Sequence, residues 1–303
     1  MSASITVVGS INMDLVVRCD EIPSVGETLI GKELLQIPGG KGANQAVALA
    51  KLNNDVIFLG KIGRDNYGHE LLQSMNRANI NTTYIERENI STGIAIINVD
   101  KYGNNNIVVI PGANGEVDKD YLNKNVEAID RSDIILFQLE IPIETVKEGL
   151  KISKKLGKTT ILNPAPAADL DDEMISNIDI LIPNEHELER MSKVVIKDEE
   201  SLVKAAKVLL SKGIKEIIVT LGSKGVFYMD HEKHQYFEAY KVDVIDTTAA
   251  GDSFIGGFIS SYGENKDIVK SINMGQKAAS ITIQRIGAQS SLPTESEIER
   301  INI

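Results

Sequence analysis

Cysteine and histidine are scarce in this chain. Its 303 residues include one cysteine, Cys19, so an intrachain disulfide and a cysteine-based zinc site are both excluded. The four histidines are scattered and form no His-x-x-x-His pair, which argues against a zinc hydrolase. The sequence therefore gives no indication of a zinc enzyme.

Long apolar runs and blocks of positive charge are also missing. No run of about 18 apolar residues is present that could cross a membrane. The N-terminal stretch Ile5-Thr6-Val7-Val8-Gly9 has neither the basic flank nor the length of a signal peptide. The formal net charge is −11, and no Lys/Arg block could grip nucleic acid or an anionic membrane. We therefore expect a cytoplasmic soluble protein that binds neither nucleic acid nor membrane.

Short apolar runs alternate with amphipathic segments along the whole chain. This alternation predicts a layered α/β sheet with helices on both faces. The expected buried strands are Ile5–Val8, Val56–Leu59, Ile134–Leu139, Thr160–Leu162, Ile178–Ile182 and Ile217–Thr220. The expected helices are Ala43–Leu52, Tyr67–Ala78, Ile143–Leu156, Leu202–Leu210, Ser253–Tyr262 and Ile268–Gln284. No Pro/Gly/Ser linker is visible, so we expect residues 1–303 to form a single domain.

Two stretches in the N-terminal part break this alternation. Leu15–Cys19 with Glu27–Leu35, and Gly93–Val99 with Asn106–Ile110, resemble antiparallel strand pairs. We interpret them as one small β-sheet, from about 13–36 and 92–111, inserted as a lid over the carboxyl edge of the main sheet. A surface hairpin without function is the simpler alternative.

The most informative stretch is Asp246-Thr247-Thr248-Ala249-Ala250-Gly251-Asp252-Ser253-Phe254. A turn of small residues precedes an apolar run, which predicts a buried helix. Asp252 would lie near the first turn of that helix. The start of a helix presents unpaired N–H groups and the positive end of the helix dipole, which together favour an anion. A carboxylate beside an anion site suggests phosphoryl transfer.

A second glycine-rich stretch is Pro38-Gly39-Gly40-Lys41-Gly42-Ala43-Asn44-Gln45-Ala46. Its glycines would let a ligand approach the backbone, and Lys41 and Asn44 can face the same side of the following helix. It is not a Walker A loop, because Gly42 stands where Ser or Thr is required. Taken alone, it could equally be a glycine-rich helix cap.

Polar residues follow several of the expected strands. Asn12 and Asp14 follow the first, Glu140 and Asn163 lie at the ends of two others, and Asn184 and Glu187 open a helix after a fourth. Each of these signals is weak alone, since loops are usually polar. Together they place polar groups at one edge of the sheet, where open α/β sheets bind ligands. The turn Thr220-Leu221-Gly222-Ser223-Lys224-Gly225 could line a nucleotide or be a plain hairpin turn.

With these motifs the chain resembles the ribokinase-like (PfkB) family of carbohydrate and nucleoside kinases, from Val8 to Ser291. The most specific parts are Gly-Gly-Lys-Gly-Ala-Asn at 39–44 and Asp-Thr-Thr-Ala-Ala-Gly-Asp at 246–252. The resemblance implies a Rossmann-like sheet with a β lid, a homodimer formed through that lid, and ATP-dependent phosphorylation of D-ribose at its 5-hydroxyl.

The resemblance also implies a role for each matching residue. Asp252 would be the general base, and Ala249, Ala250, Gly251 and Asp252 would form the anion hole. The sugar site would comprise Asn12, Met13, Asp14, Gly40, Lys41, Gly42, Ala43, Asn44 and Glu140, together with Asp252. ATP would contact Asn184, Thr220, Leu221, Gly222, Ser223, Lys224, Gly225, Gly251, Asp252 and Gln276.

Two metal ions are implied in the same way. Glu187 would lie near Mg²⁺, and a monovalent cation, K⁺, would bind at Asp246, Thr248, Thr282, Arg285, Gly287 and Ser291, several of them through backbone carbonyls. Two alternatives to the ribose activity stay open. One is a kinase of the same family for 2-deoxyribose, fructose or a nucleoside such as adenosine, since Met13 could shift the preference. The other is a non-catalytic sugar-binding protein on the same fold.

Overall fold

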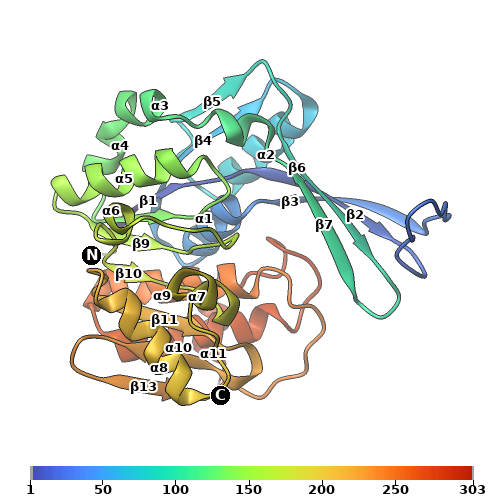
Figure 1. Ribbon diagram of the computed structural model, residues 1–303. Coiled ribbons are helices and arrows are strands. Elements are labelled where there is room, and N and C mark those ends of the chain that lie inside the picture. Colours follow the sequence, from blue (N-terminus) through green and yellow to red (C-terminus); the bar gives the residue numbers. More distant parts are fainter. Residues whose placement is uncertain (1–2, 302–303) are drawn as a thin grey trace.

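The computed structural model describes residues 3–301, which build a nine-stranded sheet and a second, four-stranded sheet (Figure 1). The nine strands lie in the order β13-β12-β11-β10-β9-β8-β1-β4-β5. Neighbours from β11 to β5 are parallel, while β12 and β13 add an antiparallel edge. The layered α/β class expected from the sequence is therefore confirmed.

The strands of the main sheet are short, and helices alternate with them. The strands are β1 (Ser4–Val8), β4 (Asp55–Gly63), β5 (Ile85–Glu88), β8 (Ile134–Phe137), β9 (Thr159–Leu162), β10 (Ile180–Leu181), β11 (Glu216–Thr220), β12 (Val226–Met229) and β13 (His234–Phe237). The helices are α1 (Lys41–Lys51), α2 (Asn66–Arg77), α3 (Lys119–Lys124), α4 (Val126–Asp130), α5 (Ile143–Lys155), α6 (Asp172–Ile175), α7 (Glu185–Ser192), α8 (Glu199–Leu210), α9 (Ala250–Asn265), α10 (Ile268–Thr282) and α11 (Glu295–Arg300).

Alternating side chains of each central strand enter two separate cores. In β1, Ile5 and Val7 pack into one core and Val8 into the other, because successive side chains of a strand point to opposite faces. Helices α1, α2, α9 and α10 cover the first core, and α3 to α8 cover the second. Strands buried on both faces read as continuous apolar runs, which is why they were recognisable in the sequence.

The four-stranded sheet has the order β3-β2-β6-β7 and extends from one side of the molecule (Figure 1). Its strands are β2 (Asn12–Arg18), β3 (Glu33–Gly39), β6 (Gly93–Val99) and β7 (Asn105–Ile110). The two antiparallel pairs expected from the sequence are present, and a parallel pairing of β2 with β6 joins them.

The second strand of the first pair was misplaced by the sequence pattern. Glu27–Leu35 was expected, whereas β3 runs from Glu33 to Gly39 and includes Pro38. Proline lacks an N–H and normally argues against a strand, but β3 is an edge strand and needs no donor on its outer side. Strand β5 was also missed, because its sequence Ile-Glu-Arg-Glu carries no apolar pattern.

No helix within residues 3–301 is both long and apolar enough to span a membrane.

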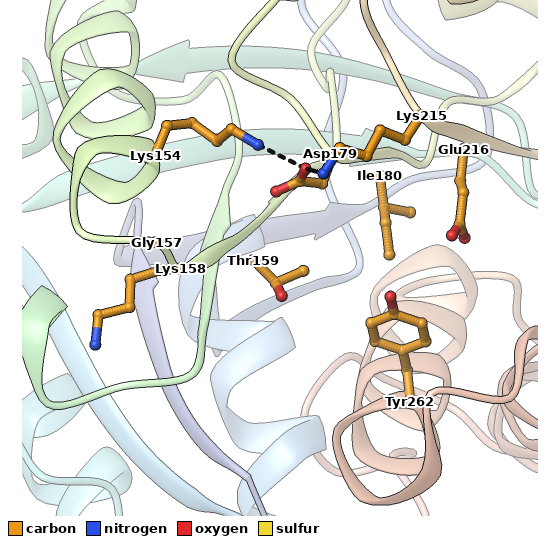
Figure 2. A pocket seen from close by; sticks show the side chains of 9 residues that line it. All are labelled: Lys154, Gly157, Lys158, Thr159, Asp179, Ile180, Lys215, Glu216 and Tyr262. Carbon is orange, nitrogen blue, oxygen red and sulfur yellow. Dashed lines mark hydrogen bonds and ion pairs between the residues drawn. The ribbon is translucent and has the colours of Figure 1, made fainter.

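The amino-terminal edge of the main sheet holds a cavity of about 310 Å³ (Figure 2). The first residues of β9, β10 and β11 line it together with Lys154, Lys215 and Tyr262. Both lysine Nζ atoms bind the same oxygen of Asp179, at 2.7 and 2.8 Å. Because the first residues of these strands line it, the cavity lies at the opposite edge of the sheet from the carboxyl ends, where we expect the reactive residues.

Glu216 in this cavity predicts a pH-dependent stability. One of its oxygens, Oε2, is buried without a hydrogen-bond partner. Burial, reinforced by the negative charges of Asp230 and Asp179, raises the pKa of Glu216 from 4.5 to about 7. The folded protein then binds more protons than the unfolded chain between these two values, so stability falls as the pH rises through this interval. Because the side chain is partly exposed, we expect a loss of only about 1 kcal/mol.

The measurement is urea unfolding at pH 5 and pH 8. Glu216→Gln should raise the free energy of unfolding at pH 8 and remove this part of its pH dependence. Glu232→Gln is the matched control, because Glu232 is an exposed glutamate in the nearby β12–β13 turn. Equal pH dependence in the wild type and Glu216→Gln would contradict the assignment.

Candidate active site

The polar residues expected at strand ends lie at the carboxyl ends of neighbouring strands. Asn12 and Asp14 follow β1, Glu140 follows β8, Asn184 follows β10, and Thr220 ends β11. In the sheet these strands are adjacent, in the order β11-β10-β9-β8-β1. The side chains therefore converge on one edge, although they are spread over more than 200 residues of sequence.

The start of α9 lies at this edge and lacks a side-chain cap. Its N-cap residue, Ala249, adopts a left-handed conformation with φ of 60°, which is rare for a residue other than glycine. The N–H of Ala250 is bonded to the Thr247 carbonyl at 3.2 Å. The N–H groups of Ala249, Gly251 and Asp252 have no acceptor within residues 3–301. A Cβ on Gly251 would meet no atom within 4 Å, so this turn presents free donors to open space.

The Asp252 carboxylate stands beside these donors and is 9% exposed. Its Oδ2 accepts a hydrogen bond of 3.1 Å from Asn44 Nδ2, and its Oδ1 accepts one of 2.9 Å from Gln45 Nε2. The Oδ1 of Asn44 in turn accepts from Gln289 Nε2 at 3.2 Å. Helix α1 and helix α9 thus meet at this carboxylate, which is fixed by two amides while its surroundings stay open toward the turn.

Glu140 fastens the glycine-rich loop to the end of β1. Its Oε2 accepts from Ser10 Oγ at 2.5 Å and from the Lys41 N–H at 3.0 Å. Gly42 approaches so closely that a Cβ would lie 2.6 Å from the Ser10 nitrogen, so only glycine fits there. Ala43, in the first turn of α1, is buried in the hydrophobic core that this helix covers. The loop is therefore held to the site by backbone proximity as well as by the carboxylate.

Asp14 lies against the same loop. A Cβ on Gly39 would fall 2.1 Å from Asp14 Oδ2, so the carboxylate occupies the space that a side chain would need. Burial raises the pKa of Asp14 to about 7; the negative charges of Glu140 and Asp252 act in the same direction, and Lys41 opposes them. Asp14 is thus partly protonated at neutral pH until a ligand supplies donors.

Lys41 is the cation among these carboxylates. Burial lowers its pKa, but Asp252, Glu140, Glu187 and Asp14 outweigh that effect, so its pKa is raised. The ammonium group therefore stays charged. The four carboxyl groups that act on Lys41 outnumber this single ammonium, so the site keeps a net negative charge, which suits a neutral sugar and calls for a metal ion alongside any polyphosphate.

Asn12 is oriented by a residue that the sequence pattern did not single out. Asn114 donates from Nδ2 to Asn12 Oδ1 at 2.7 Å and to the Ile11 carbonyl at 3.2 Å. Asn114 follows β7 and is 1% exposed, and its only signal in the sequence is its position two residues after Pro111-Gly112. The side chain of the neighbouring Met13 is fully buried in the core, so its role toward a sugar stays a prediction.

The residues proposed for ATP form the neighbouring part of the edge. Asn184 caps α7 by accepting from the Glu187 N–H at 2.8 Å, and Glu187 Oε2 accepts from the Asn184 N–H at 2.8 Å. Burial raises the pKa of Glu187, although the Asn184 N–H and Lys41 oppose it. Asn184 also forms a β-bridge with Thr220. The capping box alone explains these two residues structurally, so their nucleotide contact stays a prediction.

The turn from Leu221 to Gly225 continues from Thr220. Gly222, Ser223 and Lys224 form one turn of 3-10 helix, exposed to solvent. Gly225 is required for a structural reason, since a Cβ there would lie 1.9 Å from the Phe237 carbonyl oxygen. Gln276 is buried and donates from Nε2 to the Glu238 carbonyl at 3.0 Å. It therefore ties α10 to the chain that leaves β13.

The structure brings part of the proposed cation group together. The Asp246 carboxylate accepts from the Thr248 N–H at 2.9 Å and from the Gly287 N–H at 2.9 Å, joining the two loops. Arg285 binds Glu297 at 2.7 Å through its side chain, and Ser291 Oγ donates to the Ala288 carbonyl. The backbone carbonyls of both residues accept no hydrogen bond within residues 3–301.

Thr282 fits the cation group less well than the others. Its Oγ1 is bonded to Ser253 Oγ and to the Ala278 carbonyl, and its own carbonyl accepts from the Arg285 N–H at 3.1 Å. Within residues 3–301, no group of three or more His, Cys, Asp or Glu side chains could hold a metal ion. A cation site made of backbone carbonyls does not need such a group.

An uncapped helix start, a buried carboxylate beside it and several polar side chains at one edge of the sheet form the arrangement expected of a phosphotransferase that acts on an alcohol. The model of the pfkB family carbohydrate kinases matches residues 2–295. The chain belongs to the pfkB family of carbohydrate kinases.

Several members of the family are similar over their whole length. A ribokinase from Haemophilus influenzae is 43% identical, with 98% of this chain and 97% of that protein covered. A deoxyribokinase from Salmonella typhi is 36% identical, with 98% and 97% covered. The structure of Arabidopsis thaliana ribokinase complexed with ribose and ATP has a TM-score of 0.93 at 31% identity, covering 99% of this chain and 98% of that one.

Proposed function

We propose that the protein transfers the γ-phosphoryl group of ATP to the 5-hydroxyl of D-ribose. The observation that carries this proposal is the buried Asp252 carboxylate beside the unpaired N–H groups at the start of α9. Asp252 takes the proton of the 5-hydroxyl while the oxygen of that hydroxyl forms a bond to the γ-phosphorus. The bond between that phosphorus and the bridging oxygen breaks, and ADP leaves with the electron pair. The free backbone N–H groups of Ala249, Gly251 and Asp252 stabilise the transferring phosphoryl charge, whereas the Ala250 N–H is engaged by the Thr247 carbonyl.

The sugar is held by groups that suit a neutral polyol. Asn12, Asp14, Lys41, Asn44 and Glu140 supply acceptors and donors for hydroxyls. Glu140 has one oxygen engaged by Ser10 and Lys41, which leaves its other oxygen for a ligand. This arrangement serves positioning, and in a loose transition state correct positioning contributes more than strong basicity does.

ATP binds on the side of β10 and β11 in this proposal, along Asn184 and the turn from Thr220 to Gly225. The site fits a magnesium ion that arrives with the nucleotide, because Mg²⁺ is usually held by one or two carboxylates and substrate phosphates. Glu187 is the carboxylate we assign to its neighbourhood, and the bound ion neutralises phosphate charge. This also explains how a chain with a net charge of −11 attracts a polyanion.

A potassium ion is proposed for the two loops joined by Asp246. Carbonyl oxygens of Asp246, Thr248, Arg285, Gly287 and Ser291 would hold it, with Thr282 as the least available member. The ion would stiffen the turn that precedes Ala249 and so keep the free N–H groups aimed at the phosphoryl group.

The test of this function is ADP release with a panel of acceptors, each with and without K⁺. We expect the highest kcat/KM with D-ribose and higher activity when K⁺ is present. The alternative with a specific observation in its favour is phosphorylation of 2-deoxyribose, since a deoxyribokinase is similar over the whole chain. A higher kcat/KM for 2-deoxyribose, fructose or adenosine than for ribose would reject the proposed acceptor.

We also propose that the protein is a homodimer. The four-stranded sheet would be the lid of a single domain and would form the dimer contact. Strand β7 is exposed over its whole length. Its apolar side chains lie on both faces of the sheet: Ile107 and Val109 on one, Val108 and Ile110 on the other. An exposed apolar patch on a sheet is normally covered by a partner. Light scattering at micromolar concentration should give twice the mass of 33.1 kDa, and a monomer would contradict the dimer.

A further inference from the structure

Gln45 touches the reacting carboxylate but has no role in the scheme above. It lies in α1, directly after Asn44, and is 0% exposed. Its Nε2 donates to Asp252 Oδ1 at 2.9 Å. A polar side chain is costly to bury unless every donor and acceptor is satisfied, so the partners of this amide need a full account.

The Gln45 amide has a defined orientation because two other amides bind it. Gln138 Nε2 donates to Gln45 Oε1 at 2.6 Å. The second proton on Gln45 Nε2 goes to Asn163 Oδ1 at 3.1 Å. A flipped amide would place its oxygen against the Asp252 carboxylate and against Asn163 Oδ1, and the bond from Asn163 Nδ2 to the Ile182 carbonyl sets the orientation of Asn163. The hydrogen-bond network thus admits a single orientation, in which Gln45 donates to Asp252.

The two outer amides are anchored on the central strands. Gln138 follows β8 directly and is 0% exposed, and Asn163 follows β9 and is 8% exposed. Asn163 Nδ2 donates to the Ile182 carbonyl at 3.0 Å, which fastens the chain of amides to the end of β10. Three adjacent strands therefore hold one side chain of α1, and through it one carboxylate of α9.

We propose that Gln45 is a positioning residue that fixes the rotation of the Asp252 carboxylate for proton transfer from the acceptor hydroxyl, and that Gln138 and Asn163 fix Gln45. This inference rests on the proposed role of Asp252 as the base. A buried amide suits the task because it has no proton to gain or lose between pH 5 and 9, so the geometry is the same across that range. A base displaced by about 1 Å costs on the order of 10²-fold in rate.

The experiment compares Gln45→Met with the wild type, because methionine fills a similar volume without donating. We expect kcat to fall about 10- to 100-fold, while KM for ribose changes less than about threefold. The same substitution is then made in the Asp252→Asn background. There it should lower kcat by less than about threefold, because the group on which Gln45 acts is already gone.

Two further variants keep the test decisive. Gln45→Leu also removes the donor without adding a charge, so it carries the same expectation where Gln45→Met does not fold. Asn54→Leu is the matched control at the other end of α1, where Asn54 Nδ2 binds the Leu49 carbonyl at 3.0 Å and Ser260 Oγ at 2.9 Å. It should lower the melting temperature and leave kcat unchanged.

Each outcome decides one question. A folded Gln45 variant with kcat within twofold of the wild type overturns the inference, as does an equal loss in both backgrounds. If the wild type itself phosphorylates no acceptor in the panel, the proposed function fails, and the inference fails with it. If it prefers a sugar other than ribose, the same comparison is made with that sugar and the inference stands or falls separately.

Discussion

Replacing Asp252 by asparagine is expected to lower kcat by about 10²- to 10⁴-fold, the usual contribution of a general base. The substitution preserves the size of the side chain, and the N–H groups at the start of α9 are untouched. The amide cannot take a proton from the acceptor hydroxyl at neutral pH. Sugar and ATP affinity should therefore change much less than turnover, which isothermal titration with ribose and ATP can measure beside the assay.

The control for this variant lies on the same helix. Glu264 is an exposed residue of α9 at the end remote from the site, so Glu264→Gln changes the charge of the helix equally without touching the site. It should keep full turnover. Unchanged turnover in Asp252→Asn would remove this residue from the role of base, whatever the effect of the control.

Replacing Asp14 by asparagine is expected to weaken sugar binding. A hydrogen bond to a charged acceptor contributes about 1.5–3 kcal/mol, so KM for ribose should rise about 10- to 100-fold at pH 8 with a smaller effect on kcat. The pKa of Asp14 is raised to about 7, chiefly by burial. The carboxylate that accepts the hydroxyls is thus lost as the pH falls below about 7. The wild-type KM should rise between pH 8 and pH 6, and in Asp14→Asn this pH dependence should disappear.

Asp20→Asn provides the comparison for this prediction. Asp20 lies just beyond the other end of β2, is exposed, and pairs with Lys32. Its substitution should leave KM unchanged at both pH values. A KM for ribose within twofold of the wild type in Asp14→Asn would show that this carboxylate does not hold the sugar.

The parts of the molecule that were predictable from sequence have a local physical cause. Strands buried on both faces are continuous apolar runs, and helices that cover a core are amphipathic, so the central strands of the main sheet could be recognised one by one. The turn before Asp252 and the glycine-rich loop could also be recognised, because a helix start that presents free N–H groups requires small residues in sequence around it.

The interactions that the sequence did not predict join distant segments. Gln45, Gln138 and Asn163 come from three elements, and only the order of β8, β9 and β10 brings them to one carboxylate. Asn114 is similar, since it orients Asn12 from a loop about 100 residues later. The register of β3 depends on its being an edge strand, and the sequence of β3 alone does not contain that fact.

The measurement that tests the central claim most directly is identification of the product by ³¹P and ¹³C NMR after incubation of the wild type with ATP, Mg²⁺, K⁺ and D-ribose. The account predicts one phosphate ester at C5 of ribose, formed in equal amount with ADP. Phosphorylation at another carbon, or release of ADP and inorganic phosphate without a sugar phosphate, would contradict it.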